Sequence, residues 1–372
     1  MLKIAIFWLC LILLTQVYIL YPLSMRFFSL FKKKASSPQK SNKFVSIIIS
    51  AYNEADSIEE KILNTLALDW PKEKMEILIG DDGSSDGTSE IAERYSSQIH
   101  FLKNEKNEGK AAMLNKLCKL AKGEVFLLSD ANAMLESDAL MHLVPELENE
   151  DVGCVCGLLS LKSENEDDSS LSETEILYWK KESRLKELEG RFGAVMGSNG
   201  ALYAIRSELY PELPTHKTVM DDFYITAKIL MKGYSGVFCE NARAYENVSA
   251  EKYGEFSRKV RIGRANFNFL SSYLPLLSPL RPMRAYIFLS HKLLRWFSPF
   301  MLLAVALCSV FLIQKNLFYK AFFTLELMFV VAAFMRLRTY NYFLSMNAAL
   351  FIGFFKSFFK EKNGAWKRVK RG

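Results

Sequence analysis

The chain has 372 residues, a formal net charge of +7 and 50% hydrophobic residues, enough for one sizeable folded domain and an additional apolar region. The basic surplus does not indicate nucleic-acid binding, because the extra lysines and arginines are concentrated beside apolar segments. The six cysteines lack the spacing of a zinc site or a disulfide framework, and they fit small buried side chains in a reducing compartment.

The first apolar segment, IAIFWLCLILLTQVYILYPL, carries no charge over the length that a helix needs to cross a membrane. A cleaved signal peptide is the alternative, but the residues MRFF that follow do not form a small-residue cleavage site. We predict an anchor at residues 1–25 and a basic linker at residues 26–43. By the positive-inside rule, the next domain then lies in the cytosol, on an integral protein of the cytoplasmic membrane.

Residues 44–270 have the pattern of a soluble α/β domain. The apolar runs FVSIIISAY, MEILIGDD, IHFL and EVFLLSD alternate with segments of helical character. This alternation predicts a doubly wound sheet, in which ligands bind outside the carboxyl ends of the strands. Polar side chains follow three of these runs, and they are Asn53 with Glu54, Asp81 with Asp82, and Asp130 with Asn132. We expect these side chains to meet at one edge of the sheet.

Carboxylates gathered at one edge repel one another unless a positive charge neutralises them. Oxygen ligands from Asp130 and Asn132 would suit Mg²⁺ or Mn²⁺, which commonly also hold substrate phosphates. Each aspartate alone also fits a helix cap or a turn. The segment NEGKAAMLN departs from the Walker pattern, so Lys110 is either a solvated first-turn lysine or a contact to phosphate or acceptor.

The ordered set SIIISAYNE, IGDDGSSDGT, NEGKAAMLN, LLSDAN, GSNGALYAIR, MDDF and SRKVRIGRAN resembles the membrane-anchored family 2 glycosyltransferases, an inverting group with the GT-A fold. The likeness covers about residues 44–269. It implies a GT-A mixed sheet and transfer of a sugar from a nucleotide-sugar, expected to be UDP-linked, to a lipid-linked or saccharide acceptor in cell-surface glycan synthesis. The alternative is a non-catalytic nucleotide-sugar-binding scaffold with co-subunits in a membrane polysaccharide synthesis complex.

The resemblance also assigns donor-side roles to residues of this chain. Tyr52, Glu54 and Asp82 would contact the base and the ribose. Asp130 would hold the metal and the diphosphate. The second acid of the family's D-x-D motif is Asn132 here, and an amide oxygen can coordinate only without charge.

On the acceptor side, Asp221 and Asp222 match the family's acidic pair, and Asp222 corresponds to the catalytic base. Displacing a nucleoside diphosphate from a sugar requires a base for the acceptor hydroxyl and stabilisation of the departing charge. One carboxylate opposite the leaving group would give inversion. Alternatively, both aspartates cap the helix FYITAKILMKG.

Two further segments are candidates for substrate contacts. The amphipathic helix SLSETEILYWKKESRLKELEGRFG offers Tyr178 or Trp179 for stacking on an acceptor sugar, although most such helices simply pack on a core. Asn199 and Gly200 are expected beneath the acceptor. Arg258 and Arg261 either neutralise the diphosphate or touch lipid headgroups. The tryptophan of the processive Q-x-x-R-W motif is replaced by isoleucine, which argues against processive synthesis.

The C-terminal part of the chain returns to an apolar composition. We predict an interfacial segment at residues 271–292, membrane helices at residues 293–360 and a basic tail at residues 361–372. The last apolar piece, residues 342–359, is expected to lie at the interface or to re-enter, because spanning would place the basic tail outside.

Overall fold

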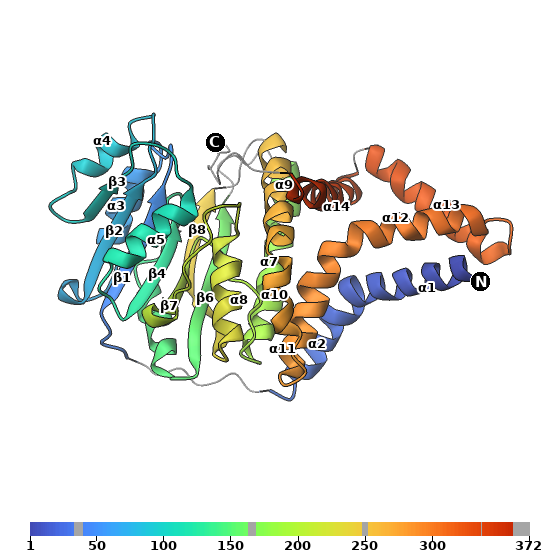
Figure 1. The fold of residues 1–372 in the computed structure, drawn as a ribbon, viewed down its shortest axis with the longest axis horizontal. Helices are drawn as coiled ribbons and strands as arrows, with labels where there is room; N and C mark the ends of the chain where they lie inside the picture. Colours follow the sequence, from blue (N-terminus) through green and yellow to red (C-terminus); the bar gives the residue numbers. More distant parts are fainter. Residues whose placement is uncertain (33–39, 163–168, 248–251, 336, 360–372) are drawn as a thin grey trace.

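The computed structural model describes residues 1–32, 40–162, 169–247, 252–335 and 337–359 (Figure 1). An α/β part lies at one end of the molecule, and helices from both ends of the sequence extend away from it (Figure 1). The predicted basic tail and part of the predicted linker lie outside the described residues.

Eight strands form one sheet, and they are β1 (Val45–Ala51), β2 (Met75–Asp81), β3 (His100–Lys103), β4 (Val125–Asp130), β5 (Met134–Leu135), β6 (Val152–Lys162), β7 (Tyr203–Arg206) and β8 (Ser235–Asn247). Their order is β3-β2-β1-β4-β7-β6-β8-β5. Strands β3, β2, β1 and β4 run parallel, β7 is antiparallel to both of its neighbours, and β8 is parallel to β6. The predicted mixed α/β sheet is confirmed.

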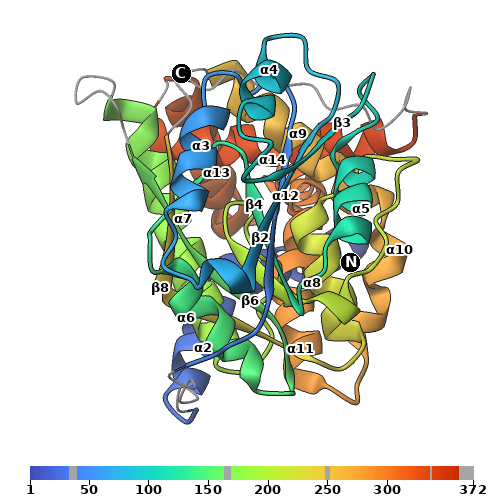
Figure 2. The same cartoon turned by 90° about the vertical axis from the view of Figure 1, so that its left-hand side faces the viewer.

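Helices cover both faces of this sheet, and they are α3 (Ile58–Leu66), α4 (Thr88–Glu93), α5 (Lys110–Leu120), α6 (Ala139–Leu143), α7 (Ser169–Gly190) and α8 (Asp221–Met231). The helix α9 (Lys252–Asn268) follows β8 along the chain. Ile47 and Ile49 of β1 pack in one core with Ile62 of α3, whereas Ile48 packs in a second core with Met113 of α5. Figure 2 shows α3 and α5 on opposite sides of β2. This two-sided burial explains why the strand sequences are continuously apolar.

The register of the parallel strands aligns their carboxyl ends. Ser50 of β1 lies opposite Gly80 of β2 on one side and Asp130 of β4 on the other. Asp81 pairs with Ala51, the last residue of β1. The loops that follow these three strands therefore start at the same edge of the sheet.

Three helices are long and apolar enough to cross a membrane among the residues described, namely Leu2–Ser29, Pro282–Leu312 and Leu317–Phe334. Phe7 of α1 (Leu2–Thr15) is buried in one cluster with Met301 and Val305 of α12 (Leu294–Leu312). The second helical run begins at Pro282, so it includes the end of the segment that the sequence placed at the interface. These helices extend away from the sheet in Figure 1.

The helix α14 (Arg338–Ser357) packs against α9 and also contacts α12 and the apolar helix Leu317–Phe334. A Cβ atom on Gly353 would lie 2.7 Å from the backbone nitrogen of Arg264, so the two helices approach closely where a glycine permits it. The helix is not one of the three candidate spans found in the described residues. Its expected place at the membrane interface stays a prediction.

Candidate active site

The loops after β1 and β2 are joined to each other by hydrogen bonds. The backbone N–H of Asn53 donates to Ser84 Oγ at 2.7 Å, and the N–H of Glu54 donates to Thr88 Oγ1 at 2.8 Å. Asn53 has a φ of 55°, a left-handed conformation that asparagine tolerates better than most side chains. Tyr52 and Glu54, the predicted donor contacts, are thereby placed on a pinned loop at the carboxyl edge.

Asp82 lies one step deeper and is fully buried. Its carboxylate accepts hydrogen bonds from Asn104 Nδ2 at 2.8 Å, from the N–H of Glu108 at 3.0 Å and from the N–H of Gly109 at 2.7 Å. A carboxylate on backbone N–H groups at the start of α5 also suits the positive end of that helix. In this structure Asp82 fixes the position at which Lys110 begins α5, and its contact with a nucleotide stays a prediction.

Lys110 joins the predicted metal and acceptor sides of the site. Its Nζ lies 2.6 Å from Asp130 Oδ1 and 3.0 Å from Asp221 Oδ2. Burial opposes the charge on Lys110, but the carboxylates of Asp130 and Asp221 outweigh that effect and raise its pKa. Lys110 is thus paired with two carboxylates rather than left to solvent, and its contact with phosphate or acceptor stays a prediction. One ammonium group connects α5, the end of β4 and the start of α8.

Asp130 is held from the side of β7 by Gly200. The Asp130 N–H donates to the Gly200 carbonyl at 2.9 Å, and a Cβ atom on Gly200 would lie 2.6 Å from Asp130 Oδ2. The neighbouring Asn199 uses its amide inside the protein, since Nδ2 donates to the Gly157 carbonyl at 2.8 Å and Oδ1 accepts from the Leu202 N–H at 3.0 Å. Gly200 thus lies against the site, while Asn199 braces the turn that presents it.

Lys61 is a residue of the site region that the sequence reasoning missed. It is fully buried beneath the loop after β4, where its Nζ donates to Ser129 Oγ at 2.7 Å and also to the Ala133 carbonyl. These two bonds hold the chain on both sides of Asp130. The sequence does contain a signal, because Lys61 falls on the apolar face defined by Ile58 and Ile62.

Asp222 occupies the first turn of α8, directly after Asp221. Its Oδ1 accepts a hydrogen bond from the Phe223 N–H at 2.7 Å. Asp222 therefore also stabilises the N-terminus of α8, in line with the alternative that the aspartates cap this helix. Burial and the adjacent Asp221 raise the pKa of Asp222 to about 6, while Lys110 and Lys186 act in the opposite direction. A half-buried carboxylate that titrates near neutral pH is suited to accept a proton.

Residues 46–207, which carry Asp130 and its supporting loops, match the family profile described as glycosyl transferase family 2. This part of the chain is a family 2 glycosyltransferase domain.

Individual relatives agree with this assignment. A beta-monoglucosyldiacylglycerol synthase from Trichormus variabilis is 36% identical over 122 residues, 32% of this chain and 26% of that protein. A poly-beta-1,6-N-acetyl-D-glucosamine synthase from Staphylococcus aureus is 26% identical over 196 residues, 51% of this chain and 46% of that protein. The matches therefore span between about a quarter and a half of the length of these relatives.

One solved structure matches nearly the whole chain. A mannosyltransferase from Pyrobaculum calidifontis, in complex with GDP-Man and Mn²⁺, has a TM-score of 0.70 and 22% sequence identity, and the match covers 95% of this chain and 98% of that chain. The likeness extends through the α/β part and the apolar helices. It confirms the predicted GT-A fold of the glycosyltransferase domain.

The glycosyltransferase domain offers few side-chain ligands for a divalent cation. No group of three or more His, Cys, Asp or Glu side chains placed to hold an ion occurs among the described residues. Asp130 provides one carboxylate at the strand end, and Asn132, half-buried two residues later, forms no side-chain hydrogen bond within the described part of the chain. Such a sparse oxygen set fits a cation whose coordination is completed by water and substrate phosphate.

Other predicted contacts of the glycosyltransferase domain lie on α7 and α9. Trp179 packs against the main core, and its Nε1 is buried without a hydrogen-bond partner. The ring of Tyr178 faces Arg295 at 5.4 Å and Lys259 at 4.8 Å, so its surface is already covered. On α9, Arg258 is half-buried and Arg261 is exposed, and their contact with a diphosphate stays a prediction.

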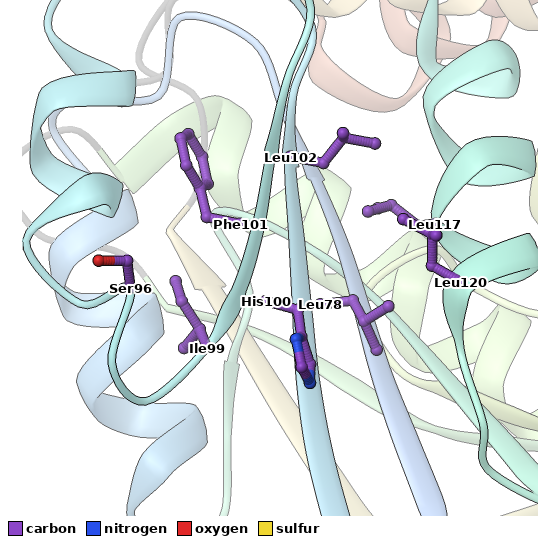
Figure 3. A pocket seen from close by; sticks show the side chains of 8 residues that line it. All are labelled: Leu78, Ser96, Ile99, His100, Phe101, Leu102, Leu117 and Leu120. Atoms are coloured by element: carbon purple, nitrogen blue, oxygen red, sulfur yellow. The ribbon is translucent and has the colours of Figure 1, made fainter.

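An apolar pocket of this domain lies away from these residues, at the edge strand β3 (Figure 3). Its lining includes Leu78, Phe101 and Leu117, with His100 as the sole side chain of its lining that can titrate. It contains none of the predicted catalytic, donor, acceptor or metal residues. The carboxyl edge of the sheet is therefore the better candidate site.

Proposed function

We propose that the protein is a membrane-bound, inverting and metal-dependent glycosyltransferase that moves a sugar from a nucleotide-sugar to a hydroxyl of a lipid or saccharide acceptor. The observation that carries this proposal is the position of Lys110, whose ammonium group contacts both Asp130 and Asp221. It brings the carboxylate expected at the donor diphosphate next to the acidic pair expected at the acceptor.

On the acceptor side, Asp222 removes the proton from the attacking hydroxyl. Its raised pKa suits this role, because a base that titrates near the working pH combines availability with affinity for the proton. Attack on the face opposite the leaving diphosphate inverts the anomeric carbon. Asp221 stays paired with Lys110 and keeps a second negative charge beside Asp222.

On the donor side, Asp130 and Lys110 face the diphosphate. A divalent cation at Asp130 and Asn132 would supply positive charge that stabilises the departing nucleoside diphosphate. Lys110 contributes a fixed ammonium group to the same region, and Asp82 holds that lysine in place through the N–H groups that precede it. Tyr52 and Glu54 contact the base and ribose.

The nucleotide is proposed to be UDP on the strength of the sequence resemblance, with GDP as the competitor because the archaeal mannosyltransferase binds GDP-Man. The names of the two curated relatives support both a glycolipid and a polysaccharide product. The replacement of tryptophan by Ile262 favours addition of one sugar at a time. The basic linker favours a cytosolic site on the cytoplasmic membrane.

The surroundings of Asp222 support an acceptor that arrives from the membrane. Phe223 packs edge-to-face against Tyr273 at 4.8 Å and against Trp296 at 5.5 Å. Trp296 belongs to the apolar helical run Pro282–Leu312. The residue next to the proposed base is therefore in direct contact with a candidate membrane helix.

A donor panel tests the proposal on the full-length protein in detergent or lipid. UDP- and GDP-sugars are supplied with Mn²⁺ or Mg²⁺, together with octyl glucoside, dioctanoylglycerol or octyl phosphate as acceptor. Release of nucleoside diphosphate that depends on acceptor and stops on addition of EDTA is the expected result. Failure of every donor would overturn the proposed activity, and turnover that ignores EDTA would overturn the metal.

A further inference from the structure

One face of α7 carries three buried ionisable side chains close to the membrane helices. Glu182, Lys186 and Glu189 are 7%, 4% and 0% exposed, and their spacing places them along one side of the helix. Buried charges are costly unless they are paired or hydrogen-bonded. The partners of these three residues therefore indicate what each side chain does.

Both glutamates are fully partnered, mostly by the helical run that begins at Pro282. Glu182 contacts His291 Nε2 at 3.1 Å, Lys292 Nζ at 3.1 Å and Arg295 at 3.2 Å. The partners of Glu189 are His291 Nδ1 at 2.5 Å, the Tyr21 hydroxyl at 2.5 Å and the Met196 N–H at 3.0 Å. The two carboxylates thus fasten α7 to the membrane helices.

Lys186, which lies between these glutamates, makes no hydrogen bond and no ion pair with any described residue, although it is 4% exposed. It stands four residues after Glu182, a spacing at which a salt bridge is common on helices. Instead its Nζ lies 6.0 Å from the ring centre of Trp179, whose Nε1 is buried without a hydrogen-bond partner. Two hydrogen-bond donors are therefore left unused in one region.

The part of α7 that carries Lys186 packs near the proposed base, because Leu188 of α7 lies in one buried cluster with Met196 and with Phe223, the residue after Asp222. Burial opposes its charge, but Cys156, Glu182 and Asp222 raise its pKa, so the side chain is an ammonium group. Conversely, Lys186 is one of the groups that lower the pKa of Asp222. Cys156 in turn lies 3.4 Å from Asn199 Nδ2, in the turn that presents Gly200. The unused donor thus belongs to the acceptor side of the site.

We propose that Lys186 is an acceptor-positioning residue that donates a hydrogen bond to a neutral saccharide oxygen next to the hydroxyl that Asp222 deprotonates. This inference rests on the proposed glycosyl transfer and names the acceptor class. A neutral oxygen fits better than a phosphate, because Asp221 and Asp222 lie nearby and would repel an anion.

Steady-state kinetics on the full-length protein test this assignment, with octyl glucoside as the acceptor. Lys186→Met is expected to raise the acceptor KM about tenfold or more, because a charged donor is lost, with kcat and donor KM little changed. Lys186→Gln retains a neutral hydrogen-bond donor, so its acceptor KM should lie between those of wild type and Lys186→Met. The exposed Lys181→Met on the same helix is the matched control.

The outcomes separate this inference from the proposed activity. If the wild-type protein transfers sugar and Lys186→Met has the same acceptor KM, the role of Lys186 is overturned. The role of Lys186 is also overturned if Lys186→Met lowers kcat, raises the donor KM and lowers the thermal unfolding midpoint together. Such a general effect would indicate a purely structural lysine. Wild-type transfer only to octyl phosphate or dioctanoylglycerol overturns the saccharide acceptor. Absence of turnover with every donor and acceptor instead contradicts the glycosyltransferase activity itself.

Discussion

The carbonyl oxygen of Gly200 accepts a hydrogen bond from the Asp130 N–H at 2.9 Å, and a Cβ atom on Gly200 would lie 2.6 Å from Asp130 Oδ2. No side chain fits between the two residues without moving the carboxylate. The glycine therefore sets where the proposed donor-side charge is held.

Gly200→Ala is expected to displace the Asp130 carboxylate and lower the transfer rate by about 10²-fold, the scale of effect that a small misplacement produces. The thermal unfolding midpoint should change little, because the turn keeps the Asn199 bonds. Transfer rate and unfolding are measured on the same preparation. Full activity in this variant would show that the position of Asp130 is not critical.

Lys110→Met removes the ammonium group that contacts Asp130 and Asp221, and the two carboxylates are then left facing each other without it. We expect transfer to fall by about 10²-fold or more, comparable to loss of one fixed charge-stabilising donor. Lys119→Met, on an exposed position of the same helix, should keep wild-type activity. Equal rates in both variants would contradict a role for Lys110 at the diphosphate.

The pH dependence of transfer should report Asp222. Its pKa of about 6 means that the carboxylate is lost as pH falls through this value, so the rate should decline below it and level off above it. Because Lys110 lowers the pKa of Asp222, the residual activity of Lys110→Met should decline at a higher pH than that of wild type. If the rate of Lys110→Met declines at the same pH as that of wild type, the proposed interaction between Lys110 and Asp222 is contradicted.

Lys61 gives a prediction on stability rather than on rate. Burial lowers the pKa of Lys61 to about 7, whereas an unfolded lysine titrates near about 10.4. Between these values the unfolded chain binds the extra proton, so the folded state gains stability as pH rises. The unfolding midpoint of wild type should therefore rise relative to that of Lys61→Met from about pH 7 to about pH 9. A constant difference would mean that Lys61 titrates normally.

The sequence predicted the features that depend on local pattern. The apolar runs ending in Asp81 and Asp130 are strands, and their parallel register follows from the helices between them. Lys110, expected in the first turn of a helix, is the residue at which α5 begins. These elements were predictable because strand periodicity, turn residues and helix starts are encoded over a few neighbouring positions.

The features that were not predicted depend on contacts between distant segments. A lysine in a helix usually faces solvent, so neither Lys61 nor Lys186 stood out, and only the packed structure shows both buried. The hydrogen bonds by which Asp82 holds the loop before α5 were also not predicted, and its contact with a nucleotide stays a prediction. Residue type alone does not distinguish a substrate contact from a group that holds a substrate-contacting loop.

The most direct test of the account is the transfer rate of Asp222→Asn, measured on full-length protein with the best donor and acceptor of the panel. The amide keeps the shape of the side chain but does not accept the proton, so the rate should fall by about 10² to 10⁴-fold. Nucleotide binding and the unfolding midpoint should stay close to those of wild type. Transfer at the wild-type rate would contradict Asp222 as the base. Absence of transfer in both proteins, with nucleotide-sugar binding intact, would instead indicate a non-catalytic scaffold.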